Sequence, residues 1–150
     1  MFQKIFLPLI FIFAFISCSS DDDFTDELNA NRLLWQSSQI KDYTLNERIS
    51  CFCGGLLSWD VFVLNSIKDR VEFDETQLPS NQIYDDIFNN SRTVEESFDF
   101  IESLLSQNVA SLNVEYDDVY GFPNHISIDY VANAVDDEIS YIYTSFEITN

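Results

Sequence analysis

Two cysteines separated by one residue, Cys51 and Cys53, are the side chains whose type and spacing point most directly to chemistry. In an extended strand their Cα atoms would lie about 6.6 Å apart, at a rise of about 3.3 Å per residue. That distance is near the upper limit of the roughly 4.4–6.8 Å found in disulfides. A bend at Gly54-Gly55 would bring the two sulfurs together. We expect a local disulfide, and a thiol-redox pair or a metal site is the alternative.

The amino-terminal residues indicate export. Lys4 is the only charged residue before an apolar run over residues 5–16, and this run is shorter than the roughly 20 residues that span a bilayer. Residues 1–17 are therefore predicted to be a secretory signal peptide. Outside the cytoplasm, reduced and unliganded thiols are disfavoured, which supports the disulfide interpretation of the cysteine pair.

The end of this segment carries a lipidation motif. Phe15-Ile16-Ser17-Cys18 resembles the lipobox of bacterial lipoproteins, although Phe15 stands where leucine is usual. The resemblance implies that Cys18 is acylated and that its lipid inserts into a bilayer, because several acyl chains anchor a protein stably. Residues 18–24 then form an acidic tether. Its Asp21-Asp22-Asp23 run looks like the export tag of some surface lipoproteins, which predicts an outer-membrane location in the cell envelope, exposed at the surface.

Composition and charge narrow the classes of function. The chain has 150 residues, of which 46% are hydrophobic and 15% aromatic, so it contains enough apolar material for one folded core. We assign a single domain to residues 25–150. Only 7 basic side chains stand against 26 acidic ones, giving a formal charge of −19. Nucleic acid is excluded as an expected partner, because binding to phosphates depends on basic side chains.

Hydrophobic periodicity predicts an α+β fold. Runs of alternating strands are interrupted by one central helix without regular βαβ alternation, which favours a mainly antiparallel sheet of about six strands packed against an N-terminal helix and the central helix. The expected strands are 43–53, 59–64, one beginning at Val71, 112–116, 126–130 and 139–148, and the N-terminal helix is 24–39.

The elements between the strands have their own signals. Asn65 to Asp69 supply turn residues, and the segment 75–92 reads as a loop with one short turn over 83–88. Thr93 and Glu96 fit a capping box, which predicts the start of the central helix. Its apolar face would consist of Val94, Phe98, Ile101 and Leu105.

Several short segments together resemble a known family. The chain is similar to uncharacterised bacterial lipoproteins known only as a domain of unknown function, over the region from Trp35 to the carboxyl end. The resemblance implies an envelope lipoprotein and supplies no activity, so no catalytic residue is carried over. The matching segments are Asp42-Tyr43-Thr44, Cys51-Phe52-Cys53, Thr93-Val94-Glu95-Glu96-Ser97-Phe98, Val114-Glu115-Tyr116-Asp117, Gly121-Phe122-Pro123, Ile126-Ser127-Ile128-Asp129 and Asp136-Asp137-Glu138-Ile139-Ser140-Tyr141.

Two groups of residues are candidate metal ligands. Cys51 and Cys53 with His125, the single histidine, could begin a zinc site that would still need a carboxylate. Acidic residues in the loops that bound the last strands could hold calcium, although the EF-hand spacing is absent and solvated loop carboxylates are the simpler interpretation. These residues are Asp117, Asp118, Asp136, Asp137 and Glu138.

The remaining interpretation is a binding module without catalytic activity. The chain contains no Gly-x-Ser-x-Gly elbow, phosphate-binding loop or His-Glu-x-x-His pair. The candidate binding surface is the turn that carries Tyr120, Phe122 and Pro123, which we expect to project beside acidic residues toward another envelope component. No cofactor is expected. The alternative function is a thiol-redox or metal-binding envelope protein that uses Cys51 and Cys53.

Overall fold

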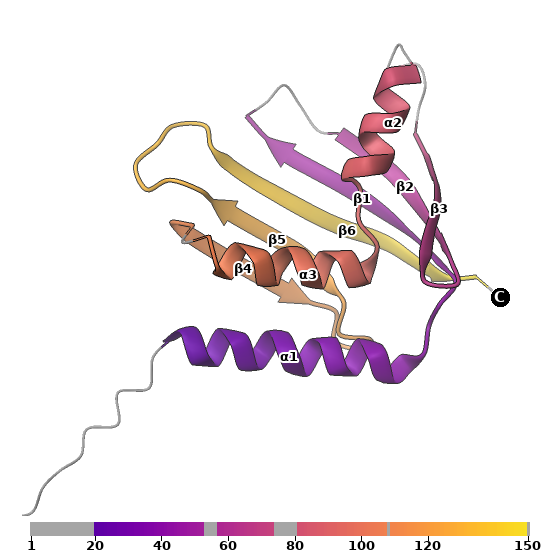
Figure 1. The fold of residues 1–150 in the computed structure, drawn as a ribbon, viewed down its shortest axis with the longest axis horizontal. Helices are drawn as coiled ribbons and strands as arrows, with labels where there is room; N and C mark the ends of the chain where they lie inside the picture. Colours follow the sequence, from indigo (N-terminus) through magenta and orange to yellow (C-terminus); the bar gives the residue numbers. More distant parts are fainter. Residues whose placement is uncertain (1–19, 53–56, 74–80, 108, 150) are drawn as a thin grey trace, which may run out of the picture.

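The computed structural model describes residues 20–52, 57–73, 81–107 and 109–149 and has the predicted α+β architecture (Figure 1). One six-stranded antiparallel sheet has the strand order β3-β2-β1-β6-β5-β4. The strands are β1 (Tyr43–Cys51), β2 (Leu57–Leu64), β3 (Ile67–Glu72), β4 (Ser111–Tyr116), β5 (Pro123–Asp129) and β6 (Glu138–Ile148). The helices are α1 (Ser20–Ser38), α2 (Asn81–Asn90) and α3 (Val94–Leu105).

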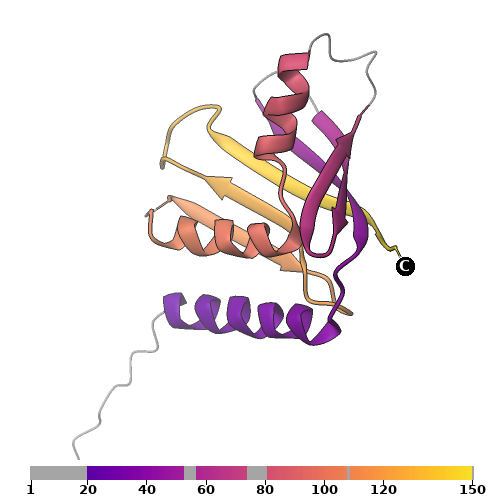
Figure 2. The same ribbon diagram turned by 45° about the vertical axis from the view of Figure 1, so that its right-hand side comes forward.

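The sheet consists of two three-stranded meanders joined by the pairing of β1 with β6. Helices α1 and α3 lie alongside each other on one face of the sheet, and α2 lies near β3 (Figures 1 and 2). The inward side chains of the strands pack under the helices and are buried. Those with the least exposure are Tyr43, Leu45, Val61, Val63, Ile126 and Ile128.

The hairpin between β2 and β3 is tighter than the sequence predicted. The turn is only Asn65 and Ser66, with φ of 53° and 63°, and Ile67 already pairs with Leu64. Two-residue hairpin loops of this type need left-handed backbone at both positions, because that twist matches the twist of the strands. Asparagine tolerates this conformation well, so the residues expected to continue the turn instead begin β3.

The prediction of a loop over 75–92 is wrong for its second half, because Asn81–Asn90 form helix α2. Within this helix Tyr84, Ile87 and Phe88 recur at spacings of three and four residues, which places them on one helical face. Ile87 is buried, and the ring of Tyr84 stacks on Phe88 at 6.3 Å and packs against Phe73 at 6.2 Å. Packing against β3 therefore stabilises a helix that is flanked by turn-forming asparagines.

The capping box at the start of α3 is confirmed. The Thr93 hydroxyl accepts a hydrogen bond from the Glu96 N–H, and the Glu96 carboxylate accepts one from the Thr93 N–H. Val94, Phe98 and Ile101 are buried as predicted. The fourth residue of the predicted face is wrong: Leu105 is 40% exposed, whereas Leu104 is 1% exposed. The buried face ends at Leu104 because that residue follows Ile101 by three positions.

Helix α1 begins at Ser20, before the predicted start at residue 24. The run Asp21-Asp22-Asp23, which was expected in the tether, lies in the first turns of the helix. Acidic residues are favourable there, because the helix dipole places partial positive charge at the amino terminus. Within the described part of the chain, no helix is both long and apolar enough to cross a membrane.

Candidate functional site

The first turn of α3 is fixed to β1 by two inward-facing residues of that strand. The Val94 N–H donates to the Tyr43 hydroxyl at 2.8 Å. The Arg92 N–H donates to Glu47 Oε2 at 3.3 Å. Both contacts satisfy backbone donors at or near the start of a helix, where the helix itself supplies no acceptors. These two hydrogen bonds therefore fix the backbone at the start of α3 to strand β1.

Glu47 is a buried carboxylate, and no sequence motif singled it out. It is 0% exposed and accepts hydrogen bonds from Trp59 Nε1 at 2.9 Å and from the Tyr143 hydroxyl at 3.2 Å. Its Oε1 also lies 3.7 Å from Arg92 Nη1. Burial raises the pKa of Glu47, against the opposing effects of Trp59, Arg92 and Tyr143. Because the carboxylate is closed to solvent, its role is to hold β1, β2, β6 and α3 together.

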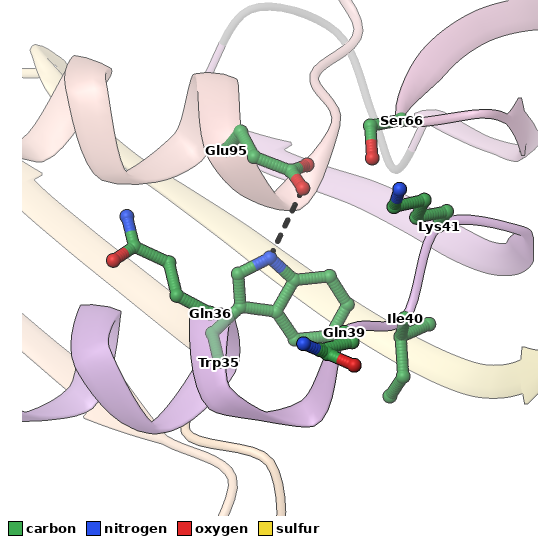
Figure 3. Close-up of a pocket in the computed structure, with 7 residues that line it drawn as sticks. All are labelled: Trp35, Gln36, Gln39, Ile40, Lys41, Ser66 and Glu95. Carbon is green, nitrogen blue, oxygen red and sulfur yellow. Dashed lines mark hydrogen bonds between the residues drawn. The ribbon is translucent and has the colours of Figure 1, made fainter.

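An open pocket lies beside the start of α3. It is bounded by the C-terminal end of α1, the β2–β3 turn and the first turn of α3 (Figure 3). Its volume is about 510 Å³. We call it the Glu95 pocket. It is lined by Trp35, Gln36, Gln39, Ile40, Lys41, Ser66 and Glu95.

The Glu95 carboxylate is held in a fixed orientation at the wall of this pocket. Trp35 Nε1 donates to Glu95 Oε1 at 3.1 Å, and the Tyr43 hydroxyl donates to Oε2 at 3.2 Å. Trp35 and Tyr43 are 2% and 0% exposed, so both donors are themselves fixed by the core. Burial, followed by the charge of Glu95, raises the pKa of Tyr43, and its hydroxyl remains a donor at physiological pH.

The other polar groups of the pocket come from segments that are coupled to one another. The Ser66 N–H donates to the Lys41 carbonyl at 2.8 Å, which ties the β2–β3 turn to the segment between α1 and β1. Gln39, with φ of 56°, ends α1 in the left-handed conformation typical of a helix terminus. Figure 3 shows Lys41 and Ser66 on one side of the Glu95 carboxylate and Gln36 on the other. An ammonium group, a hydroxyl group and amides thus surround a fixed carboxylate.

Comparison with known sequences assigns the chain to a family. A model of the family of unknown function DUF6174 matches residues 27–148. The chain belongs to this family. The match runs from within α1 to the last residue of β6, so the DUF6174 domain includes the whole sheet and all seven residues of the Glu95 pocket. The resemblance to a domain of unknown function is therefore confirmed. No curated protein matches the chain.

In this DUF6174 domain, the turn with Tyr120, Phe122 and Pro123 does not project as the sequence suggested. Phe122 is 5% exposed and Pro123 is buried, while Tyr120 is half-buried. The turn packs under α1: the ring centroids of Phe122 and Trp35 are 6.3 Å apart. Gly121, with φ of 76°, allows this approach, since a Cβ there would lie 2.7 Å from the Asn31 carbonyl oxygen. The aromatic residues of the turn serve mainly as core.

A bulge in β6 places Phe146 against Trp35 and Phe122. The register between β1 and β6 shifts opposite Leu45, where Ser145 adopts a φ of 51°. The extra residue turns Phe146 inward, although its parity differs from that of Tyr143. The ring centroids of Phe146 and Phe122 are 4.7 Å apart. Tyr120, Phe122 and the bulge line a second pocket of about 360 Å³.

The five acidic loop residues predicted as calcium ligands are not brought together. Asp117 Oδ1 accepts the N–H groups of Val119 and Tyr120, and Asp137 Oδ2 accepts the Val131 N–H. These carboxylates thus organise their own loops. Asp117 and Asp118 precede β5, whereas Asp136, Asp137 and Glu138 follow it, so the seven residues of that strand, about 20 Å, lie between the two groups. The described residues contain no His, Cys, Asp and Glu group that could hold a metal ion.

The predicted cysteine site is only partly within the described residues. Cys51 is the last residue of β1, is half-buried and is not a free thiol. Cys53 and Cys18 lie outside the described residues, so their pairing and acylation stay predictions. His125 Nδ1 lies 3.7 Å from Glu115 Oε1 on the neighbouring strand. That contact gives His125 a partner other than the cysteines.

Proposed function

We propose that this DUF6174 protein is a lipid-anchored envelope protein that binds a ligand in the Glu95 pocket without transforming it. The observation that carries the proposal is a carboxylate oriented by two buried donors at the wall of an open pocket. Fixing a polar group before a ligand arrives lowers the entropy cost of binding.

The chemistry of the lining residues supports binding rather than catalysis. The seven lining residues include no histidine and no cysteine. Ser66 is the one lining hydroxyl, and activation of a serine needs an adjacent base. Both oxygens of Glu95 already accept hydrogen bonds from the side chains of Trp35 and Tyr43. The pocket therefore offers recognition groups but no evident nucleophile and base pair.

The proposed anchor is Cys18. The short apolar run, the Ser17-Cys18 junction and the start of α1 at Ser20 support a folded domain that begins directly after an acylated residue. The acidic residues Asp21, Asp22 and Asp23 support an outer-membrane location with exposure at the surface.

Anchoring is tested by expressing the full chain in a Gram-negative host and partitioning it between detergent and aqueous phases. The wild-type chain and a Ser19→Ala control should enter the detergent phase with a mass that includes acyl chains and lacks residues 1–17. Cys18→Ser should lack the added mass. A wild-type chain that is cleaved but carries no lipid would contradict the anchor.

Binding is tested through the indole N–H signals of the two tryptophans in nitrogen-15 NMR spectra. Trp35 Nε1 donates to Glu95 in the pocket, whereas Trp59 Nε1 donates to buried Glu47 and serves as an internal control. A Trp59→Phe variant assigns the two signals. Members of a chemically diverse fragment library should shift the Trp35 signal and leave the Trp59 signal in place. If no fragment moves the Trp35 signal, the pocket is not a binding site.

A further inference from the structure

Four of the six basic side chains in the described residues form ion pairs with acidic residues. Arg32 contacts Asp99 and Glu102, and Arg70 contacts Asp69 and Glu72. The remaining paired bases are Lys68, which contacts Glu96, and Arg92, which contacts Glu47. With 26 acidic side chains in the sequence, each base has many possible partners.

Of the two described bases without an ion pair, Lys41 and Arg48, only Lys41 lines the Glu95 pocket. Lys41 is exposed and forms no ion pair with any residue of the described segments. Glu95 lines the same pocket, yet its two oxygens are held by the neutral donors of Trp35 and Tyr43 rather than by a cation. Two opposite charges therefore face one space without neutralising each other (Figure 3).

The hydrogen bonds from Trp35 and Tyr43 hold the Glu95 carboxylate in place and away from Lys41. Glu95 is held from both oxygens by side chains of the core, so it cannot swing toward Lys41 without losing hydrogen bonds to Trp35 and Tyr43. An exposed ion pair contributes only about 0–1 kcal/mol, which does not compensate for that loss. The pocket thus presents a separated positive and negative charge to whatever enters it.

We propose that the Glu95 pocket binds a small zwitterion, with the ammonium group of the ligand on Glu95 and its anionic group on Lys41. This inference rests on the proposed binding function of the same pocket and names the class of ligand. The anionic group is a carboxylate or a phosphate, since Lys41 can pair with either as a point charge. Ser66, Gln36 and Gln39 add a hydroxyl group and two amides to the lining of the pocket.

The overall charge of the protein favours a zwitterion over a ligand that carries only one kind of charge. A formal charge of −19 attracts cations and repels anions over the surface as a whole. A ligand with only an anionic group is therefore disfavoured, and a ligand with only an ammonium group would meet Lys41 without a compensating charge. A zwitterion satisfies both pocket charges, and its net charge is zero with a carboxylate and about −1 with a phosphate monoester.

The test uses the full chain and the Trp35 indole signal. The probes are glycine, β-alanine, 4-aminobutyrate and phosphoethanolamine, each compared with an amine and an acid of the same chain length. At least one zwitterion should bind with a Kd at least tenfold lower than its matched amine and acid. A carboxylate probe and phosphoethanolamine distinguish the two anionic groups.

Three variants locate the two charges. Lys41→Gln and Glu95→Gln should each raise the Kd of that zwitterion at least tenfold. Arg48→Gln is the matched control, because Arg48 is an exposed base on β1 outside the pocket lining, and it should leave the Kd unchanged. Lys41 is exposed, so its replacement tests recognition without disturbing the core.

The outcomes separate this inference from the binding function on which it rests. An unchanged Kd in Lys41→Gln, or a matched amine that binds as tightly as the zwitterion, would overturn the zwitterion proposal. If library fragments shift the Trp35 signal but none of the zwitterions does, the pocket binds another class of ligand and only the inference fails. If neither fragments nor zwitterions shift the signal, both proposals fail.

Discussion

Replacing Gly121 with alanine should loosen the packing of α1 on the sheet. Gly121 has a φ of 76°, and an added Cβ would lie 2.7 Å from the Asn31 carbonyl oxygen and 3.0 Å from Leu34 Cβ. Left-handed backbone costs a non-glycine residue roughly 1–2 kcal/mol, and overpacking a tight contact costs roughly 1–3 kcal/mol more. The backbone oxygen of Asn31 cannot rotate away, so α1 itself must move. We expect Gly121→Ala to lower the free energy of unfolding by about 2–5 kcal/mol.

Urea unfolding followed by tryptophan fluorescence measures this loss, because Trp35 lies on α1 and its ring packs against Phe122 in the same turn as Gly121. Asn133→Ala is the control. Asn133 has a φ of 64° but is exposed, so the variant should carry the backbone cost of about 1 kcal/mol without the overpacking. If the two variants lose the same free energy within about 0.5 kcal/mol, the close approach of α1 to the turn is not what limits this position.

Four other substitutions probe the hydrogen bonds at the start of α3 and the buried face of that helix. Because burial raises the pKa of Glu47, its contribution to stability is full below the unfolded value of about 4.3 and is lost as pH rises through the folded pKa. Glu47→Gln stays neutral at every pH, so in denaturant titrations the stability of wild type relative to this variant should fall as pH rises through the folded pKa of Glu47, by about 1.4 kcal/mol per unit of pKa elevation; a difference that is independent of pH would contradict the raised pKa. Thr93→Ala removes one hydrogen bond of the capping box and should cost about 1 kcal/mol in the same titration, whereas a loss near zero would mean that the cap is dispensable. Leu104→Ala should cost about 2–5 kcal/mol, while Leu105→Ala should cost less than about 0.5 kcal/mol; equal losses would contradict their different burial.

Local sequence signals were sufficient for the sheet and for the start of α3. Strand alternation around Tyr43, Leu45 and Val114 depends only on the two-residue period of side chains, and that period survives in the folded chain. The capping box of Thr93 and Glu96 is also local, because both hydrogen bonds join residues three apart. Predictions that need only neighbouring residues were therefore reliable in this chain.

Apart from the short β2–β3 turn, the main misses depend on tertiary contacts. Helix α2 is stabilised by stacking of Tyr84 on Phe88 and by Phe73, the residue after β3, and a short segment rich in asparagine does not reveal these contacts. The inward turn of Phe146 depends on a bulge at Ser145 that reverses the strand parity. Glu47 alternates with Tyr43 and Leu45 along β1, so the strand period places all three on the same inward face. Its burial was not predicted because a charged side chain is not expected in the core.

The Glu95 pocket could not be found by motif, because its residues are spread from Trp35 to Glu95 over three separate elements. The charges of Lys41 and Glu95 become informative only when the hydrogen bonds to Trp35 and Tyr43 are known. The sequence supplied the acidic composition. In such a chain, a lysine without an ion pair in the described segments, such as Lys41, is unexpected.

The early start of α1 has a consequence for how far the protein can reach from a membrane. If Cys18 is acylated as proposed, only Ser19 separates the anchor from a helix of 19 residues, which at about 1.5 Å per residue is about 28 Å long. The Glu95 pocket lies at the far end of that helix. A long flexible linker would let the domain move over a wide range of heights above the bilayer. Here the helix follows the anchor almost directly, so the pocket lies no more than about one helix length above the bilayer. Ligands of this protein would therefore be met within about one helix length of the membrane surface.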